Sequence, residues 1–122
     1  MQLTRARPTV LLFDIDGTLI TTGGVGKKAI VKALASRGAA GGADFSFAGM
    51  TDRAIVRRGL VYSELSASEA DIDAVLVHYV KILEAEVNAA DEASYRLHAG
   101  MTEAVNRAVA RDRTACGLGT GN

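Results

Sequence analysis

The chain has 122 residues, of which 48% are hydrophobic and 23% charged, a composition typical of a protein that folds around one small core. Lysine plus arginine and aspartate plus glutamate are equal at 14 each, so there is no basic excess to bind nucleic acid or an anionic membrane surface. No apolar run approaches the ~18 to 20 residues that span a bilayer. The single cysteine, Cys116, is expected as a buried thiol, and together these features predict a cytoplasmic protein.

The first predicted element is a strand at residues 9–13, a continuous apolar run between Pro8 and a polar, glycine-containing segment. Such a run is typical of a strand in a parallel sheet that is buried on both faces. We therefore expect its C-terminal end to open into a loop.

Two helices are predicted next. Apolar residues at helical spacing indicate a helix over residues 25–37, which Gly38 ends. Either Thr51 or Asp52 can cap a shorter helix that runs through about Val61.

The longest predicted helix follows an S-x-x-E capping box formed by Ser66 and Glu69. Its apolar residues recur with the period of a helix and predict one buried face. These residues are Ile72, Val75, Leu76, Tyr79, Val80, Leu83 and Val87.

The C-terminal part predicts a helix over residues 101–111, with Val105, Ala108 and Val109 facing inward, and then a short strand at residues 115–119. Two strands so far apart in a parallel sheet require a crossover. The expected architecture is therefore an α/β core whose parts are residues 1–20 and 97–122, interrupted by a helical insertion at residues 21–96.

Two carboxylates stand two residues apart in the string Asp14-Ile15-Asp16-Gly17-Thr18-Leu19, which follows the first predicted strand. Ligands of open α/β sheets bind at this end of a strand. Like charges so close repel, a divalent cation between them relieves the repulsion, and oxygen ligands suit Mg²⁺. One carboxylate can attack phosphorus while the other transfers protons, so Asp14 and Asp16 are the candidate catalytic and metal-binding residues. The alternative is a structural pair of turn or capping residues.

The string Phe13-Asp14-Ile15-Asp16-Gly17-Thr18-Leu19 resembles the first motif of the haloacid dehalogenase-like superfamily. In that family the first aspartate is the nucleophile and the second is the general acid and base. The carboxylate of the first and the backbone carbonyl of the second bind Mg²⁺. The resemblance implies these roles for Asp14 and Asp16, and the second aspartate implies a phosphatase or phosphomutase, because dehalogenating members lack it.

Three further segments are similar to the phosphoglycolate-phosphatase-like branch, whose members carry a helical cap after the first strand. They are the helix at residues 26–34, the turn Gly49-Met50-Thr51-Asp52, and the re-entry turn Leu97-His98-Ala99-Gly100, in which Ala99 replaces the usual proline. The resemblance implies an α/β fold with a partial Rossmann-like parallel sheet, represented by its first two strands, and an inserted α-helical cap.

The C-terminal string Gly117-Leu118-Gly119-Thr120-Gly121-Asn122 resembles the family's second motif, whose Ser or Thr hydrogen-bonds the transferring phosphoryl group. The resemblance implies that Thr120 and Gly121 bind the substrate phosphate. A hydroxyl and backbone N–H groups in a glycine-rich turn can cradle an anion.

The implied activity is Mg²⁺-dependent hydrolysis of a small phosphorylated metabolite through an aspartyl-phosphate. The family's third motif, a lysine, and its fourth, an acidic pair, have no match in these 122 residues. We therefore expect weak or no turnover from these residues alone, because the reaction depends on charge neutralisation. A core of two strands with exposed edges is expected to favour self-association.

A non-enzymatic alternative is a catalytically inactive relative that acts as a helical interaction or oligomerisation module. It would pair through the apolar face of residues 72–87, because an exposed apolar stripe is stabilised by a partner. Arg53, Arg57 and Arg58 are expected on a solvated helix face.

Overall fold

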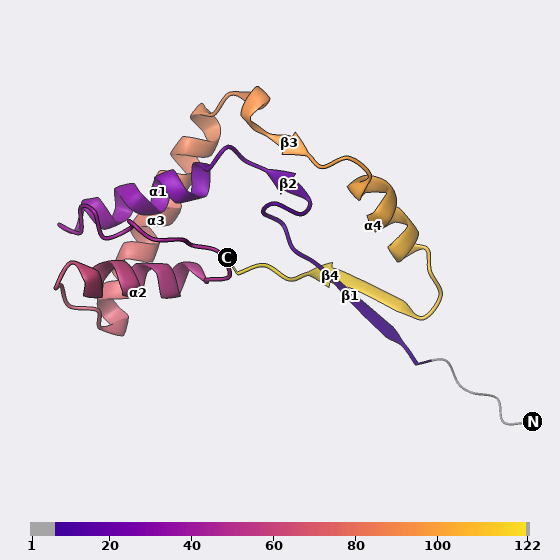
Figure 1. Ribbon diagram of the computed structural model, residues 1–122, viewed down its shortest axis with the longest axis horizontal. Coiled ribbons are helices and arrows are strands. Elements are labelled where there is room, and N and C mark those ends of the chain that lie inside the picture. Colours follow the sequence, from indigo (N-terminus) through magenta and orange to yellow (C-terminus); the bar gives the residue numbers. More distant parts are fainter. Residues whose placement is uncertain (1–6, 122) are drawn as a thin grey trace, which may run out of the picture. The chain divides into compact units, whose positions relative to one another are not determined.

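The computed structural model describes residues 7–121, which form a mixed α/β structure with four α-helices and a parallel sheet of two strands. Its elements are β1 (Thr9–Phe13), β2 (Ile20–Thr21), α1 (Val25–Ala35), α2 (Asp52–Tyr62), α3 (Glu69–Ala89), the 3₁₀ turn Glu92–Ser94, β3 (Arg96–Leu97), α4 (Met101–Val109) and β4 (Thr114–Leu118) (Figure 1). Among the described residues, no helix combines the length and the apolar character that crossing a membrane requires.

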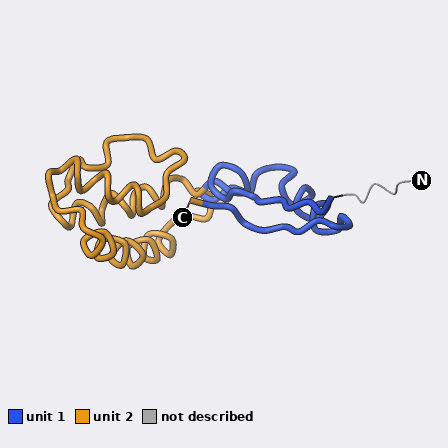
Figure 2. The backbone as a smooth tube through the Cα atoms, turned by 90° about the horizontal axis from the view of Figure 1, so that it is seen from below, with its two compact units in different colours: residues 1–21, 95–120 blue, residues 22–94, 121–122 orange. Residues whose placement is uncertain are grey.

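The described chain divides into two compact units (Figure 2). The sheet unit comprises residues 7–21 and 95–120, and the helical unit comprises residues 22–94 together with Gly121. The chain leaves the sheet unit after Thr21 and returns to it at Tyr95. The helical unit is therefore inserted between β2 and β3.

Parallel pairing of β1 with β4 organises the sheet unit. The register runs from Thr9 opposite Thr114 to Phe13 opposite Leu118. A backbone hydrogen bond of 2.9 Å from the Gly119 N–H to the Phe13 carbonyl extends the pairing beyond the last strand residue. Both predicted strands are confirmed, the second with bounds one residue earlier than expected.

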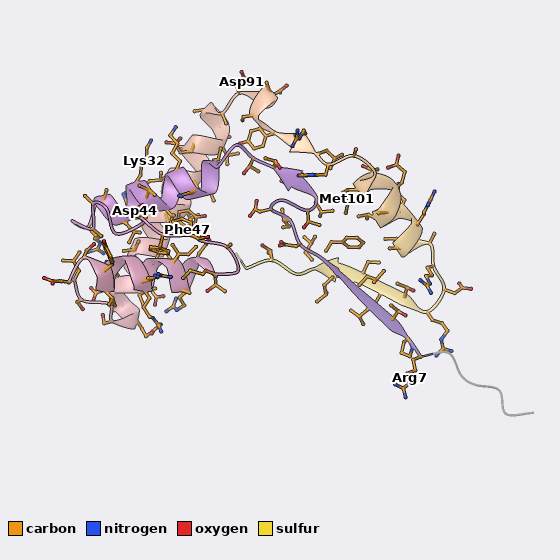
Figure 3. The ribbon with its side chains drawn as sticks, viewed as in Figure 1. Arg7, Lys32, Asp44, Phe47, Asp91 and Met101 are labelled. Carbon is orange, nitrogen blue, oxygen red and sulfur yellow. The ribbon has the colours of Figure 1, made fainter. Side chains whose placement is uncertain are left out.

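The prediction that β1 is buried on both faces is wrong. Val10 and Leu12 are 66% and 67% exposed, while Leu11 and Phe13, on the other face, are half-buried. Figure 3 shows side chains projecting from both sides of the β1–β4 pair. In the described part of the sheet unit a single helix, α4, packs against this pair, so one face lacks a covering layer.

Two further burial predictions fail in the sheet unit for the same reason. Cys116, expected as a buried thiol, is exposed. In α4, Ala108 is buried as predicted, but Val109 is 65% exposed. A short apolar residue pattern specifies which residues share a face, but it does not specify whether a second layer covers that face.

The core of the helical unit lies where α1, α2 and α3 pack together. In these helices the buried residues recur at intervals of three and four, so they line one face of each helix. Burial of each large apolar side chain contributes roughly 1.5–3 kcal/mol. Phe47, labelled in Figure 3, packs against the edge of this core. The largest fully buried side chains are Ile30, Leu34, Val56, Ile72 and Val75.

The N-terminus of α3 is capped by Ser68, not by Ser66 as predicted. The Ser68 Oγ accepts a hydrogen bond of 3.2 Å from the Asp71 backbone N–H, and α3 begins at Glu69. The Ser66 hydroxyl instead donates to the Asp71 carboxylate at 2.5 Å. The sequence contains a serine three residues before an acidic residue twice, at 66–69 and at 68–71, and the later pair marks the helix start.

The buried face of α3 is narrower than predicted. Ile72, Val75 and Tyr79 are buried in the core, but Val80 and Val87 are 59% and 45% exposed. Val80 follows Tyr79 directly and is therefore rotated by about 100° from it around the helix. These two valines lie outside the stripe that contacts the other helices.

Glu86, a half-buried glutamate of α3, forms ion pairs with two lysines of α1. The Glu86 carboxylate is 2.6 Å from the Lys28 ammonium and also accepts a hydrogen bond from Lys32. These two hydrogen bonds, with a smaller coulombic contribution, hold the pKa of Glu86 below its ordinary value.

A second charged cluster links α2 to α3. Arg53 donates to Glu69 and Asp73 at 2.6 and 2.7 Å, and Arg57 donates to Glu69 at 2.5 Å. The Arg58 guanidinium lies 4.4 Å from the centre of a phenylalanine ring. Arg57 and Arg58 are exposed and Arg53 is half-buried, so these arginines lie on the solvated helix face that was predicted.

We predict that Gly59→Ala destabilises the helical unit by about 1–3 kcal/mol, because its Cβ would overpack the core. An added Cβ at Gly59 would lie 2.7 Å from the fully buried Leu34 Cδ1 and 3.0 Å from the Gly42 carbonyl. The matched control is Gly26→Ala in α1, where the nearest atom, the Tyr79 hydroxyl, is 3.8 Å away. Gly26→Ala should be neutral or slightly stabilising. Urea unfolding followed by the helical circular dichroism signal measures both, and equal stabilities would contradict the prediction.

The lowered pKa of Glu86 predicts acid-sensitive stability. A carboxyl whose pKa is lower in the folded chain stabilises the fold above its unfolded pKa, and this contribution is lost as the pH falls through the folded pKa. The stability difference between the wild type and Glu86→Gln should therefore shrink as the pH is lowered from about 6 to about 3. Urea midpoints across this range test the prediction. The control, Glu84→Gln, alters an exposed residue of α3 that forms no ion pair with a described residue, and should not show this trend.

Candidate functional site

The predicted catalytic residues follow the C-terminal end of β1. Asp14 comes directly after Phe13, and Asp16 lies two residues further in the loop that leads to β2. Because β1 and β4 are parallel, their C-terminal ends lie at the same end of the sheet, and Thr120 follows β4 there by two residues. The structure therefore places Asp14, Asp16 and Thr120 at one end of the β1–β4 pair.

Gly121 differs from Thr120 in its surroundings. It groups with the helical unit, where an added Cβ would lie 2.9 Å from the Met50 carbonyl. Glycine permits this close approach of two backbones because it has no Cβ. Asn122, the last residue of the string that carried the resemblance, lies outside the described residues.

The loop after β1 is closed by its own backbone hydrogen bonds. The Ile15 carbonyl accepts from the N–H groups of Thr18, Leu19 and Ile20 at 3.3, 2.9 and 3.1 Å. The Gly17 N–H donates to the Ile20 carbonyl at 2.8 Å, and Gly17 has a φ of 75°. That left-handed conformation favours glycine, which explains a glycine directly after the second aspartate. The local string thus specifies a tight turn as well as two carboxylates.

The Asp14 carboxylate is exposed and partly fixed in orientation. Its Oδ1 accepts a hydrogen bond of 2.9 Å from the backbone N–H of Ile15. Among the described residues, no further hydrogen bond to this carboxylate is recorded, so Oδ2 can contact a ligand. Asp16 is also exposed, and its backbone forms a bridge with Ile20.

A short antiparallel ribbon anchors the far end of the loop. Ile20 and Thr21 of β2 pair with Leu97 and Arg96 of β3. The Thr21 hydroxyl and the His98 Nε2 are 2.8 Å apart in a partly buried hydrogen bond. The sequence analysis missed this role of His98, and no local signal could have revealed it, because the two residues are 77 positions apart.

The two carboxylates are chemically suited to Mg²⁺. This ion prefers oxygen ligands and usually retains several waters, so one or two carboxylates suffice to hold it. Asp14 and Asp16 supply such oxygens from an exposed loop. Within residues 7–121 no group of three or more His, Cys, Asp and Glu side chains is placed to hold a metal, so a site here would rely on these two residues, backbone carbonyls and water.

Two hollows lie elsewhere, in the helical unit. One, of about 190 Å³, is lined by Arg37, Leu60, Leu65, Ser66, Asp71 and Val75. The other, of about 180 Å³, is lined by Gly23, Gly24, Val25, Lys28, Glu86, Ala89 and Ala90. Neither contains a predicted site residue, and both are smaller than the ~300 Å³ typical of pockets that enclose a small molecule.

Comparisons with known proteins do not assign a family. No protein-family model matches the sequence, and none of the curated proteins gives a significant match. The local geometry and the motif resemblance are therefore the grounds on which function is argued.

The Thr21–His98 hydrogen bond predicts a role in closing the loop that carries the aspartates. Thr21→Val should weaken this closure by about 0.5–1.5 kcal/mol, because it leaves a partly buried histidine without its partner. The matched control, Thr21→Ser, retains the hydroxyl. Amide hydrogen exchange at Gly17 and His98, whose N–H groups donate to Ile20 and Leu19, measures the effect. Unchanged protection in Thr21→Val would contradict it.

Proposed function

We propose that this chain carries the nucleophile end of a Mg²⁺-dependent phosphatase site of the haloacid dehalogenase-like type, acting on a small phosphorylated metabolite. The observation that carries the proposal is the Asp14-Ile15-Asp16-Gly17 string at the carboxyl end of β1, beside the parallel strand that leads to Thr120. This end of an open α/β sheet is where ligands bind. A Rossmann-like core, a helical unit that serves as a cap, and a cytoplasmic location belong to the same proposal.

In the proposed reaction Asp14 is the nucleophile. A carboxylate oxygen of Asp14 forms a bond to phosphorus as the bond between phosphorus and the leaving ester oxygen breaks. The hydrogen bond from the Ile15 N–H to Oδ1 supports this role, because it orients the carboxylate. The product of the first half-reaction is an aspartyl-phosphate and an alcohol.

Asp16 would transfer the protons in both half-reactions. Its carboxyl group donates a proton to the leaving oxygen, and the resulting carboxylate then accepts a proton from the water that attacks the aspartyl-phosphate. Phosphate leaves and the Asp14 carboxylate is restored. The tight turn around Gly17 supports this assignment, because it fixes the backbone beside Asp16.

Thr120 would bind the phosphoryl group that Asp14 attacks, through its hydroxyl and neighbouring backbone N–H groups, with Gly121 completing the turn. Bound Mg²⁺ would supply charge neutralisation, held by the Asp14 carboxylate and by Asp16. Low turnover is proposed for residues 1–122 taken alone, because the family's lysine and acidic pair have no match among them.

The alternative proposal is a helical interaction module. Ile72, Val75 and Tyr79, which belong to the face assigned to it, are occupied by packing within the helical unit. Val80 and Val87 are the members of that face that stay exposed. Self-association that Val80→Lys abolishes, measured by light scattering, would favour this alternative.

The phosphatase proposal predicts that phosphate release from a generic phosphate ester requires Mg²⁺ and falls to background in Asp14→Asn, which keeps the side-chain shape but removes the nucleophile. The matched control is Asp44→Asn, which alters an exposed aspartate of the helical unit and should leave turnover unchanged. Mass spectrometry after incubation with acetyl phosphate and Mg²⁺ provides a second readout, a phosphoryl adduct on Asp14.

Each outcome bears on the proposal. Release that is lost in Asp14→Asn supports it, and an adduct on Asp14 without turnover supports the nucleophile role in a site that lacks the lysine and acidic pair. Turnover that survives Asp14→Asn overturns it. If neither turnover nor an adduct is observed, the proposal is also overturned, and the catalytically inactive alternative is favoured.

A further inference from the structure

The hollow of about 190 Å³ in the helical unit lies where α1 and α2 end and α3 begins (Figure 1). Leu60, Leu65 and Val75 form its apolar lining. Leu60 and Val75 belong to the buried core, whereas Leu65 is 37% exposed, so its side chain is accessible to a ligand. A hollow of this volume holds about six water molecules. It therefore suits a small metabolite better than a nucleotide or a peptide.

Two opposite charges line this hollow without pairing. Arg37 lies just after the end of α1, and Asp71 is in the first turn of α3. No ion pair joins their side chains, and within residues 7–121 the Arg37 guanidinium has no hydrogen-bond or ion-pair partner. Elsewhere in the helical unit opposite charges meet directly, as Lys28 and Glu86 do at 2.6 Å. The hollow is thus lined by a cation and an anion that do not neutralise each other by contact.

The Asp71 carboxylate is held in place and kept ionised. The hydroxyls of Ser66 and Ser68 both donate to its Oδ2 at 2.5 Å, and among the described residues no hydrogen bond reaches Oδ1. These hydrogen bonds, with a smaller contribution from the positive charge of Arg37, lower the pKa of Asp71. The charge of Arg37 therefore acts on Asp71 although the two side chains form no ion pair. Oδ1 is an oriented acceptor for a positively charged donor.

We propose that this hollow binds a small aliphatic α-amino acid in its zwitterionic form. The ligand carboxylate accepts hydrogen bonds from the Arg37 guanidinium, whose parallel N–H groups match a carboxylate. The ligand ammonium donates to Oδ1 of Asp71, and the aliphatic side chain lies against Leu65. Ligand pockets commonly combine apolar surface with a few placed polar groups in this way. An α-amino acid carries both charges on one small molecule and so satisfies both residues at once.

Charge complementarity selects this ligand class over simpler ions. A carboxylate without an ammonium would bring a second negative charge beside Asp71, and an amine without a carboxylate would bring a second positive charge beside Arg37. The hollow of about 180 Å³ lacks the same property, because Lys28 and Glu86 in its wall already neutralise each other. The uncompensated pair of charges therefore distinguishes the larger hollow.

The first test titrates the full chain with L-valine and follows the backbone amide shifts by NMR. We expect saturable shifts at the residues that line the hollow, with a dissociation constant on the order of 1 mM, because the site is small and open to water. Isovalerate lacks the ammonium and isobutylamine lacks the carboxylate, so each should bind at least about tenfold more weakly. No saturable shift, shifts centred on other residues, or equal affinity for the three compounds would overturn the proposal.

The second test uses Arg37→Gln, which keeps a polar side chain but removes the charge. Its affinity for L-valine should fall by about tenfold, because the charge-assisted hydrogen bonds to the carboxylate are lost. Isobutylamine should bind no more weakly than to the wild type. The matched control is Arg111→Gln, the same change at an exposed arginine of the sheet unit, which should bind L-valine as the wild type does.

Equal losses in Arg37→Gln and Arg111→Gln, or a parallel loss of isobutylamine binding in Arg37→Gln, would overturn the proposal. The comparison of the three compounds on the wild type decides the matter if Arg37→Gln does not fold. Neither readout depends on phosphatase activity, so this proposal and the proposed function can fail independently.

Discussion

The parallel pairing of β1 with β4 is the interaction on which the candidate site depends. Parallel strands cannot be joined by a tight turn, so the chain between them must make a crossover, and here that crossover contains the helical unit, β2, β3 and α4. The same pairing places the residues after Phe13 and those after Leu118 at one end of the sheet. A register shift by one residue would reverse which side chains face α4 and would move Thr120 relative to Asp14.

The two units are stabilised by different interactions. The helical unit has a continuous apolar core and charged links through Glu86 and Glu69 that join its helices. The sheet unit relies on backbone hydrogen bonds, on one helix, and on the Thr21–His98 contact. Regions with few buried apolar contacts open at lower free energy than packed cores. The sheet unit, which carries the two aspartates, is therefore expected to open at a lower free energy than the helical unit.

Much of the fold was predictable because its signals are local. The strand at residues 9–13 and the helix capped by Thr51 follow from short patterns, and the Asp14-Ile15-Asp16-Gly17 string specifies both its carboxylates and its turn. The errors concern relations between distant segments. The apolar run of β1 predicted burial on both faces, but burial requires a second layer that a strand cannot encode. Ser66 was chosen over Ser68 because overlapping motifs fit both. The hydrogen bond of His98 depends on a partner 77 residues away, which no spacing rule can reveal.

The proposed site depends on negative charge concentrated at the end of an exposed strand. Asp14 and Asp16 are both exposed and lie two residues apart in one loop, so a divalent cation bound there could use oxygens of both residues. In the proposed phosphoryl-transfer site that cation would be Mg²⁺.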